Sequence, residues 1–201
     1  IEISATKISA IEGVAMGPTD QLATAQEIAA ATLANVTSDQ MELPTPCSHW
    51  TVAQLIDHLV GAQHWALSAM EGVEMTETGE GSAGGDFHAS FLDAATRSLA
   101  AFRADGSLEK TVNPGFGDMP ATALLGMATT DTFQHAWDLA TATGQDNDLH
   151  PVLVSELLAA ARESTPPSFR SEDGAIFGPE QTAPQGTPVA GQLAAFLGRR
   201  V

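Results

Sequence analysis

Residues 51–65 read TVAQLIDHLVGAQHW, and their mixture of apolar and polar residues has the spacing of an amphipathic helix. Thr51 opens the stretch and Gln54 follows three residues later, which is the capping-box arrangement that starts many helices. Apolar residues then recur at helical spacing, at Val52, Leu55, Ile56 and Leu59. The pattern predicts a helix from Thr51 to about Met70, with His58 surrounded by apolar neighbours.

A second stretch, residues 129–140, reads TTDTFQHAWDLA and places Asp131 and His135 four residues apart. In a helix this spacing puts both side chains on one face, about 6 Å apart along the axis. If His58 converges on them, two imidazoles and one carboxylate form a three-ligand metal site with an open position. An open position suits chemistry or ligand exchange. The alternative is that the histidines are hydrogen-bonded core residues and that Asp131 and His135 only stabilise their helix.

Further helices are predicted by the same criteria of periodicity, capping residues and glycine or proline punctuation. The expected ranges are about 20–36, 87–103, 120–144, 151–163 and a short final helix at 189–197. A Gly-rich segment, residues 71–86, is expected to be a solvated loop rather than a mobile lid, and a short extended piece is expected at 110–116. We therefore predict an all-α fold, a four-helix bundle with an irregular Pro/Gly-rich segment and a short helix at its end.

The length of 201 residues is enough for one domain with a real core. Residues 1–15 precede the first methionine, Met16, which is followed by a helix-start pattern. We expect residues 1–15 to be an upstream or expression-derived extension, and residues 16–201 to form a single domain.

The charge balance excludes several partners. There are 25 acidic residues against 8 Lys and Arg, so a basic surface for nucleic acid or for an anionic membrane is not expected. No apolar run is long enough to cross a bilayer. The single cysteine, Cys47, excludes an internal disulfide and a Cys-rich zinc site, which fits a reducing cytoplasm. The first residues also lack the pattern of a secretion signal, so we expect a cytoplasmic location.

Other side chains near these motifs have weaker assignments. Trp65 lies seven residues after His58 and shares its helix face, so it is a candidate wall of a substrate pocket, and His49 is a candidate for the pocket mouth. Asp138, three residues after His135, is a candidate hydrogen-bond partner for that ring. Cys47 is interpreted as a small buried residue rather than a nucleophile.

Helix geometry also indicates where two further side chains lie. His64, six residues after His58, is expected at the surface or just behind the ligands. Asp57 is adjacent to His58 but points about 100° away in a helix, which makes it a weak partner for the site.

Residues 45–61, TPCSHWTVAQLIDHLVG, resemble the signature TPC-x-x-W-x-V-x-x-L-x-x-H-L-V-G of the DinB-like superfamily. The branch is that of the actinobacterial mycothiol-dependent maleylpyruvate isomerase N-terminal domain. Residues 135–146, HAWDLATATGQD, resemble its second signature. Towards the end, FRSEDGAIFGPE and QLAAFLGR resemble a subfamily described only as a metal-binding protein. The resemblance spans roughly Met16 to Arg200 and is specific for the family, not for a substrate.

The resemblance implies a DinB-like four-helix bundle that holds a divalent metal, which is zinc in the isomerase. Its ligands, a His on the second helix and a carboxylate-x-x-x-His pair on the fourth, correspond to His58, Asp131 and His135. The isomerase has Glu where this chain has Asp131, which is one methylene shorter and could admit another ion such as Ni²⁺. The sterol-carrier-like domain of the full isomerase has no counterpart in this sequence, so that specific isomerisation is not expected.

The implied chemistry uses a low-molecular-weight thiol, mycothiol or bacillithiol, that binds as its thiolate and attacks a small electrophile. This is S-transferase or thiol-dependent isomerase chemistry, with Zn²⁺ in place of a general base. Two alternatives remain open: a non-catalytic metal- or ligand-binding bundle, and a structural bundle without a metal. The sequence leaves the oligomeric state undetermined.

Overall fold

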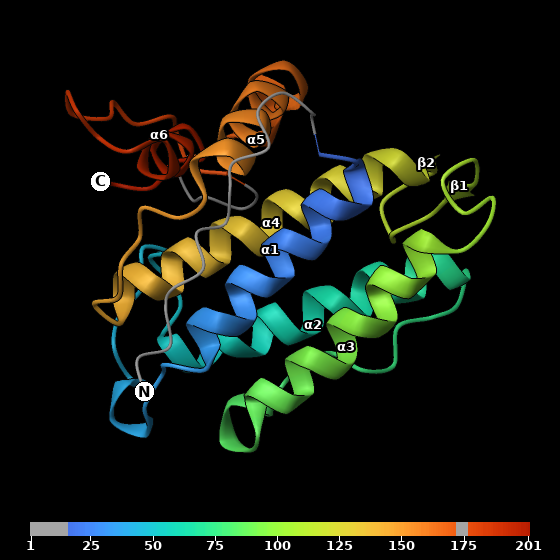
Figure 1. Cartoon of the computed structure of the whole chain (residues 1–201), viewed down its shortest axis with the longest axis horizontal. Helices are drawn as coiled ribbons and strands as arrows, with labels where there is room; N and C mark the ends of the chain where they lie inside the picture. Colours follow the sequence, from blue (N-terminus) through green and yellow to red (C-terminus); the bar gives the residue numbers. More distant parts are fainter. Residues whose placement is uncertain (1–15, 172–176) are drawn as a thin grey trace, which may run out of the picture.

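A computed structural model describes residues 16–171 and 177–201, so the expected extension at residues 1–15 lies outside the described part. The regular elements of the described chain are helices apart from one two-stranded ribbon, and loops join them (Figure 1). The long helices are α1 (Pro18–Leu33), α2 (Val52–Glu71), α3 (Phe87–Arg103), α4 (Ala121–Ala142) and α5 (Pro151–Ser164), followed by the shorter α6 (Val189–Phe196). Strand β1 (Thr111–Val112) pairs antiparallel with β2 (Met119–Pro120) just before α4 begins. The all-α fold is confirmed.

The four helices α1 to α4 form the bundle. Helix α1 packs on α4 and α3, and α2 packs on α3 and α4, so every helix has two neighbours. Helices α5 and α6 pack against each other on the α4 side of the bundle, and α6 also contacts α4 (Figure 1). This arrangement leaves α4 between the bundle and the C-terminal pair. It can therefore present side chains to both.

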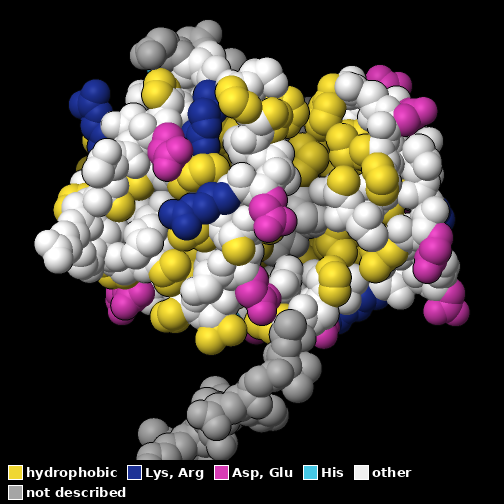
Figure 2. All heavy atoms as spheres, turned by 90° about the horizontal axis from the view of Figure 1, so that it is seen from above, with side chains coloured by type: hydrophobic (Ala, Val, Ile, Leu, Met, Phe, Trp, Pro, Cys, Tyr) yellow, Lys and Arg dark blue, Asp and Glu magenta, His cyan; other side chains and the backbone are white. Residues whose placement is uncertain are grey.

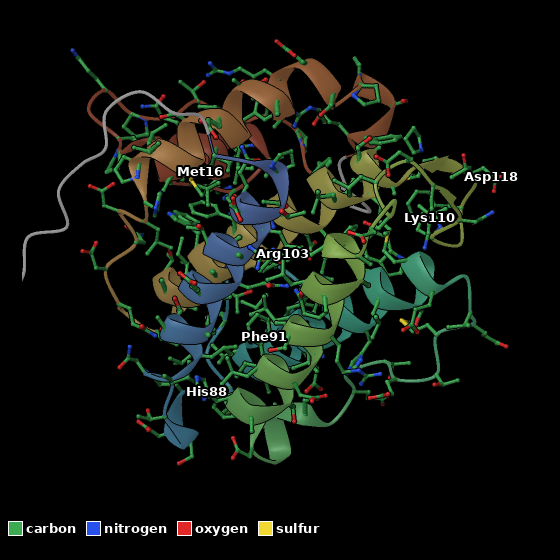
Figure 3. The ribbon with its side chains drawn as sticks, turned by 45° about the vertical axis from the view of Figure 1, so that its right-hand side comes forward. Met16, His88, Phe91, Arg103, Lys110 and Asp118 are labelled. Carbon is green, nitrogen blue, oxygen red and sulfur yellow. The ribbon has the colours of Figure 1, made fainter. Side chains whose placement is uncertain are left out.

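Apolar side chains fill the bundle interior at the spacing predicted from the sequence. Phe91, labelled in Figure 3, is fully buried from α3 and packs with residues of the other helices of the bundle. The fully buried members of this cluster include Leu55, Ile56, Leu59 and Leu139. Burying one such side chain contributes about 1.5–3 kcal/mol relative to leaving it exposed.

Polar side chains also join the helices inside the core. The amide of Gln26 donates to Gln63 Oε1 at 2.8 Å, and Gln63 Nε2 donates to Thr132 Oγ1 at 2.9 Å. The same Gln26 amide donates to the Ala95 carbonyl at 3.2 Å, so residues of α1, α2, α3 and α4 are linked. A buried amide without a partner is costly, and a shifted helix would break these bonds. The network therefore fixes the relative positions of the helices that carry His58 and His135.

The Gly-rich connection after α2 lies directly on that helix. A Cβ at Gly61 would clash with the carbonyl oxygen of Thr78, so only glycine allows this approach. The carboxylate of Asp57 accepts from the Ala83 N–H at 2.8 Å and from the Gly81 N–H at 3.0 Å. The segment is a loop, as predicted, and its fixed attachment to α2 argues against a mobile lid. Asp57 serves this attachment.

Of the two positions expected for His64, at the surface or just behind the ligands, the surface position is wrong. His64 is only 8% exposed, and its Nε2 lies 3.5 Å from Glu77 Oε2 of the same connection. The connection folds back over this face of α2, which the spacing along one helix could not reveal. Towards the same end of the bundle Arg103, labelled in Figure 3, pairs with Asp20 at 2.8 Å and links α3 to α1.

The surface agrees with the acidic composition. On the face shown in Figure 2, acidic side chains are interspersed among hydrophobic ones, and the basic side chains do not form a continuous patch. Within residues 16–171 and 177–201, no helix combines the length and apolar character required for a membrane span.

Candidate metal centre

The three predicted ligands come together between α2 and α4. His58 reaches in from α2, and Asp131 and His135 project from one face of α4, four residues apart. His58 Nε2 lies 3.4 Å from each oxygen of Asp131, and His135 Nε2 lies 3.4 Å from Asp131 Oδ1. One ligand atom from each of the three side chains lies within 4.8 Å of the others. The expected convergence is therefore observed, while their role as ligands stays a prediction.

The spacing of these atoms fits a divalent cation better than a hydrogen-bonded triad. Hydrogen bonds from N–H to O are typically about 2.9–3.0 Å, so three separations of 3.4 Å are long. Tetrahedral ligands about 2.0–2.1 Å from zinc lie about 3.4 Å from one another. Asp131 Oδ2 is buried and makes no hydrogen bond to any residue that the structure describes. A cation would complete the coordination of that oxygen.

One side of the cluster is open to solvent. The side chains of His58 and Asp131 are 33% and 32% exposed, whereas that of His135 is 8% exposed. A cation held by these residues would be reachable by a small molecule from the half-exposed side.

The electrostatics of the cluster favour positive charge between Asp131 and His135. Burial raises the pKa of the Asp131 carboxyl, but His135 and His58 beside it outweigh burial and hold that pKa well below its usual range. Burial lowers the pKa of His135, and the Asp131 carboxylate more than compensates, so the pKa of the imidazole lies above its usual value. Without a metal, a proton on His135 supplies this charge. With a metal, proton and cation compete for the same nitrogen.

The other nitrogen of His135 faces a second, closed cluster. Its Nδ1 lies 3.0 Å from Asp138 Oδ2, and the Asp138 side chain is fully buried. When Nδ1–H donates to this carboxylate, the lone pair of Nε2 faces Asp131 and His58. Histidines that bind metals usually donate their other N–H to a carboxylate in this way. The candidate partner Asp138 thus lies where the sequence placed it.

Asp138 is held by an arginine from the end of the chain. Arg199 Nε donates to Asp138 Oδ1 at 3.2 Å, and Nη2 donates to Oδ2 at 3.0 Å. Burial raises the pKa of Asp138, but Arg199 and His135 lower it to about 2, so the carboxylate stays charged. The thiol of Cys47 also lies here, 3.2 Å from Asp138 Oδ2 and 3.3 Å from Arg199 Nη2.

Cys47, His135 and Asp138 form a second group whose spacing could hold a metal. The guanidinium of Arg199 contacts both Cys47 and Asp138, and this fixed positive charge repels a cation. Among the described residues, no Lys or Arg forms an ion pair with Asp131. Of the two groups, that of His58, Asp131 and His135 therefore has the more favourable charge for a cation.

The aromatic ring beside the imidazoles is Trp50. Its ring centroid lies 4.6 Å from that of His58 and 5.5 Å from that of His135. Trp65, the expected pocket wall, lies about two helical turns from His58, where its indole N–H donates to the Pro114 carbonyl and its ring stacks on Phe116. His49 is exposed in the loop before α2, and its place at a pocket mouth stays a prediction.

Sequence reasoning missed Trp50, Cys47 and Arg199 as neighbours of the centre. The first two belong to TPCSHW, residues 45–50, so their position within a recognised motif was an available signal. Arg199 lies in QLAAFLGR, the other recognised motif near the end of the chain. No helix periodicity connects these segments to α4.

Comparison with known proteins gives a consistent result. The family described as the mycothiol maleylpyruvate isomerase N-terminal domain matches residues 22–140, which include the three candidate ligands and Asp138. The chain is 42% identical over 181 residues to uncharacterized protein Rv0738 of Mycobacterium tuberculosis H37Rv, covering 88% of this chain and 94% of that protein. The same values hold for uncharacterized protein MT0763 of strain CDC 1551. No solved structure matches the chain.

Proposed function

The chain belongs to the mycothiol maleylpyruvate isomerase N-terminal domain family, and on that premise we propose that it is a divalent-metal protein acting with a low-molecular-weight thiol. The proposed ligands are His58 Nε2, His135 Nε2 and the carboxylate of Asp131. The proposed reaction is an S-transfer, or a thiol-dependent isomerisation, on a small electrophile.

One observation supports the metal proposal most strongly: the Nε2 atoms of His58 and His135, from two helices, each lie 3.4 Å from an oxygen of Asp131, and one oxygen of this carboxylate is buried with no hydrogen bond within the described chain. Two imidazoles and one carboxylate suit zinc, which leaves a fourth position for an exchangeable ligand. The short side chain of Asp131 also permits a larger or differently coordinated ion, such as Ni²⁺, in the same place.

Zinc bound here would lower the pKa of a thiol in its open position, so that the thiol is held as thiolate at neutral pH. In the transfer the thiol would give its proton to solvent and its sulfur would bond to the electrophilic carbon, which either releases a leaving group with its bonding electrons or passes the π electron pair of a double bond to the neighbouring atom, where a proton from solvent is taken up. In an isomerisation of the second kind, later loss of that proton and of the thiolate would restore the double bond. Mycothiol or bacillithiol would be the thiol, in keeping with the family.

The chain's own residues would prepare that reaction. Asp138 keeps a proton on His135 Nδ1, and this leaves the lone pair of Nε2 free to bind the metal. The Trp50 ring lies against both imidazoles, limits their rotation and offers an apolar wall for the electrophile. The half-exposed edges of His58 and Asp131 give the thiol its approach.

Cobalt substitution tests the proposal directly. Co²⁺ loaded at one equivalent should give the visible spectrum of a four-coordinate ion, and mycothiol should add a sulfur-to-cobalt charge-transfer band. Turnover of mycothiol with a reactive electrophile should require the metal and should be lost in His58→Ala. Protein that takes up cobalt but shows neither a thiol response nor turnover would instead be a non-catalytic metal-binding bundle. Protein that takes up no cation would be a structural bundle.

A further inference from the structure

Arg199 lies on the segment that follows α6, and it is almost buried in the closed cluster behind His135. Its side chain is 11% exposed, and that of its partner Asp138 is fully buried. The two residues are 61 positions apart in the chain. Arg199 lies outside residues 22–140, the part that the family matches.

The contact between Arg199 and Asp138 fixes the carboxylate in two places. Nε donates to Oδ1 at 3.2 Å and Nη2 donates to Oδ2 at 3.0 Å, which is the fork arrangement that only arginine provides. With both oxygens held, Oδ2 stays 3.0 Å from His135 Nδ1. Arg199, Asp138 and His135 therefore form a continuous hydrogen-bonded chain that ends at the ring whose Nε2 faces Asp131.

The backbone around Arg199 is itself held firmly. Gly198 has a positive φ of 97°, and a Cβ there would lie 2.8 Å from the Gly178 backbone. Arg199 Nη1 donates to the Leu197 carbonyl at 3.1 Å. Arg170 Nη1 donates to the carbonyls of Gly178 and Phe196, at 3.2 and 2.7 Å. These contacts hold the segment after α6 against the rest of the chain, and the guanidinium of Arg199 points toward α4.

We propose that Arg199 is a positioning residue of the metal centre, acting through Asp138 to orient His135 towards the cation. The inference rests on the proposed metal site and adds the C-terminal segment to it. The segment after α6 thus completes a centre whose ligands all come from α2 and α4.

Metal affinity in matched variants tests this. Cation binding is measured by competition with a chromophoric chelator, first with Zn²⁺ and then with Co²⁺. Arg199→Gln should weaken binding about tenfold to hundredfold, the usual effect of losing a residue behind a metal ligand. Arg200→Gln is the control, because Arg200 is the next residue, is exposed and carries the same charge. It should bind as the wild type does.

A double-variant cycle separates positioning from general stability. Asp138→Asn should weaken metal binding to a similar extent, and Asp138→Asn combined with Arg199→Gln should bind no more weakly than Asp138→Asn alone, because both act through one chain. The cobalt spectrum of Arg199→Gln should also change, which a loss of stability alone would not cause. Arg199→Lys, which keeps the buried charge compensated, ensures a folded variant and should show a smaller loss of affinity.

Two results overturn the inference in different ways. If the wild type binds the cation and folded Arg199→Gln and Arg199→Lys bind it equally well, with an unchanged cobalt spectrum, Arg199 is only structural. If the wild type binds no cation, the proposed function fails and the inference fails with it.

Discussion

The two sides of the His135 ring differ in every property that matters for a metal site. On the Nε2 side, His58 and Asp131 are about one-third exposed and their contacts are long, at 3.4 Å. On the Nδ1 side, Asp138 is fully buried, Arg199 is 11% exposed and the contacts with His135 and Arg199 are 3.0 Å. One ring thus joins an open, loosely spaced cluster to a closed, tightly bonded one.

This difference separates two tasks. On the open side, the nitrogen and oxygen atoms that could bind a metal have no short hydrogen bonds to one another. This arrangement suits a cation with an exchangeable ligand. The closed side has its charges paired, so it can hold His135 in one orientation and keep the proton on Nδ1. It follows that substitutions on the open side should change metal binding with little effect on folding, whereas substitutions that break the contacts among His135, Asp138 and Arg199 on the closed side should change both.

The largest expected effect is the loss of the metal from the open side. Protein of the His58→Ala variant should retain close to no stoichiometric zinc after purification, whereas the wild type retains about one equivalent; elemental analysis measures this. His135→Ala should behave in the same way. The unfolding free energy of metal-free His58→Ala should change by only about 1 kcal/mol, since the residue is half-buried. His49→Ala, at an exposed histidine, is the control, and full metal in His58→Ala would remove the ligand assignment.

The next effect concerns folding and comes from the closed side. Asp138→Ala should lower the unfolding free energy of the metal-free protein by about 3 kcal/mol, because Arg199 is left buried without its counter-charge. Denaturant unfolding in the presence of a chelator measures the change. Asp131→Ala, on the open side, should cost about 1 kcal/mol or less in the same experiment. Equal losses for the two aspartates would contradict the distinction between the sides.

A smaller effect should follow from removing the metal itself. Free Zn²⁺ at a hundred times its dissociation constant stabilises the folded state by about 2.7 kcal/mol. For a domain of this size the melting temperature should therefore rise by roughly 5–10 °C over chelated protein. A thermal scan with and without chelator tests this in the wild type and in His58→Ala, where no shift is expected. An equal shift in the variant would place the cation elsewhere.

The smallest effect is expected at Cys47. Its thiol lies 3.8 Å from His135 Nδ1, on the closed side, and contacts Arg199. Cys47→Ser should change the zinc dissociation constant by less than about threefold, because the serine hydroxyl can still hydrogen-bond Asp138 and the Arg199–Asp138–His135 contacts stay in place. A loss of tenfold or more would instead favour the group of Cys47, His135 and Asp138 as the cation site.

Sequence reasoning worked best where the determining contacts are local. Helix α3 begins at Phe87 and ends at Arg103, as its apolar period predicts, and in the structure Asp86 caps its start. The capping box of Thr51 and Gln54 starts α2 as predicted. Helix α1 ends at Leu33, three residues earlier than the expected Val36, because the chain turns after Ala34 although its apolar period continues. The four-residue spacing of Asp131 and His135 was enough to place both on one helix face.

Contacts between distant segments could not be predicted in this way. His64 is buried because the connection carrying Glu77 folds back on α2. Arg199 reaches Asp138 only because α6 packs against α4. Trp50 lies in a loop, where helical periodicity gives no direction, and it occupies the place beside the imidazoles that helix spacing had suggested for Trp65. The position of each of these residues depends on contacts between distant segments, so only the tertiary structure reveals it.

The central claim is that His58, Asp131 and His135 hold one divalent cation, and crystallography with anomalous scattering tests it most directly. Crystals of zinc-loaded protein, measured on both sides of the zinc absorption edge, should show one peak about 2.0–2.2 Å from His58 Nε2, His135 Nε2 and an Asp131 oxygen. The Nδ1 of His135 should remain bonded to Asp138. No anomalous peak between α2 and α4, or a peak bonded to Cys47 and Asp138 instead, would contradict the account.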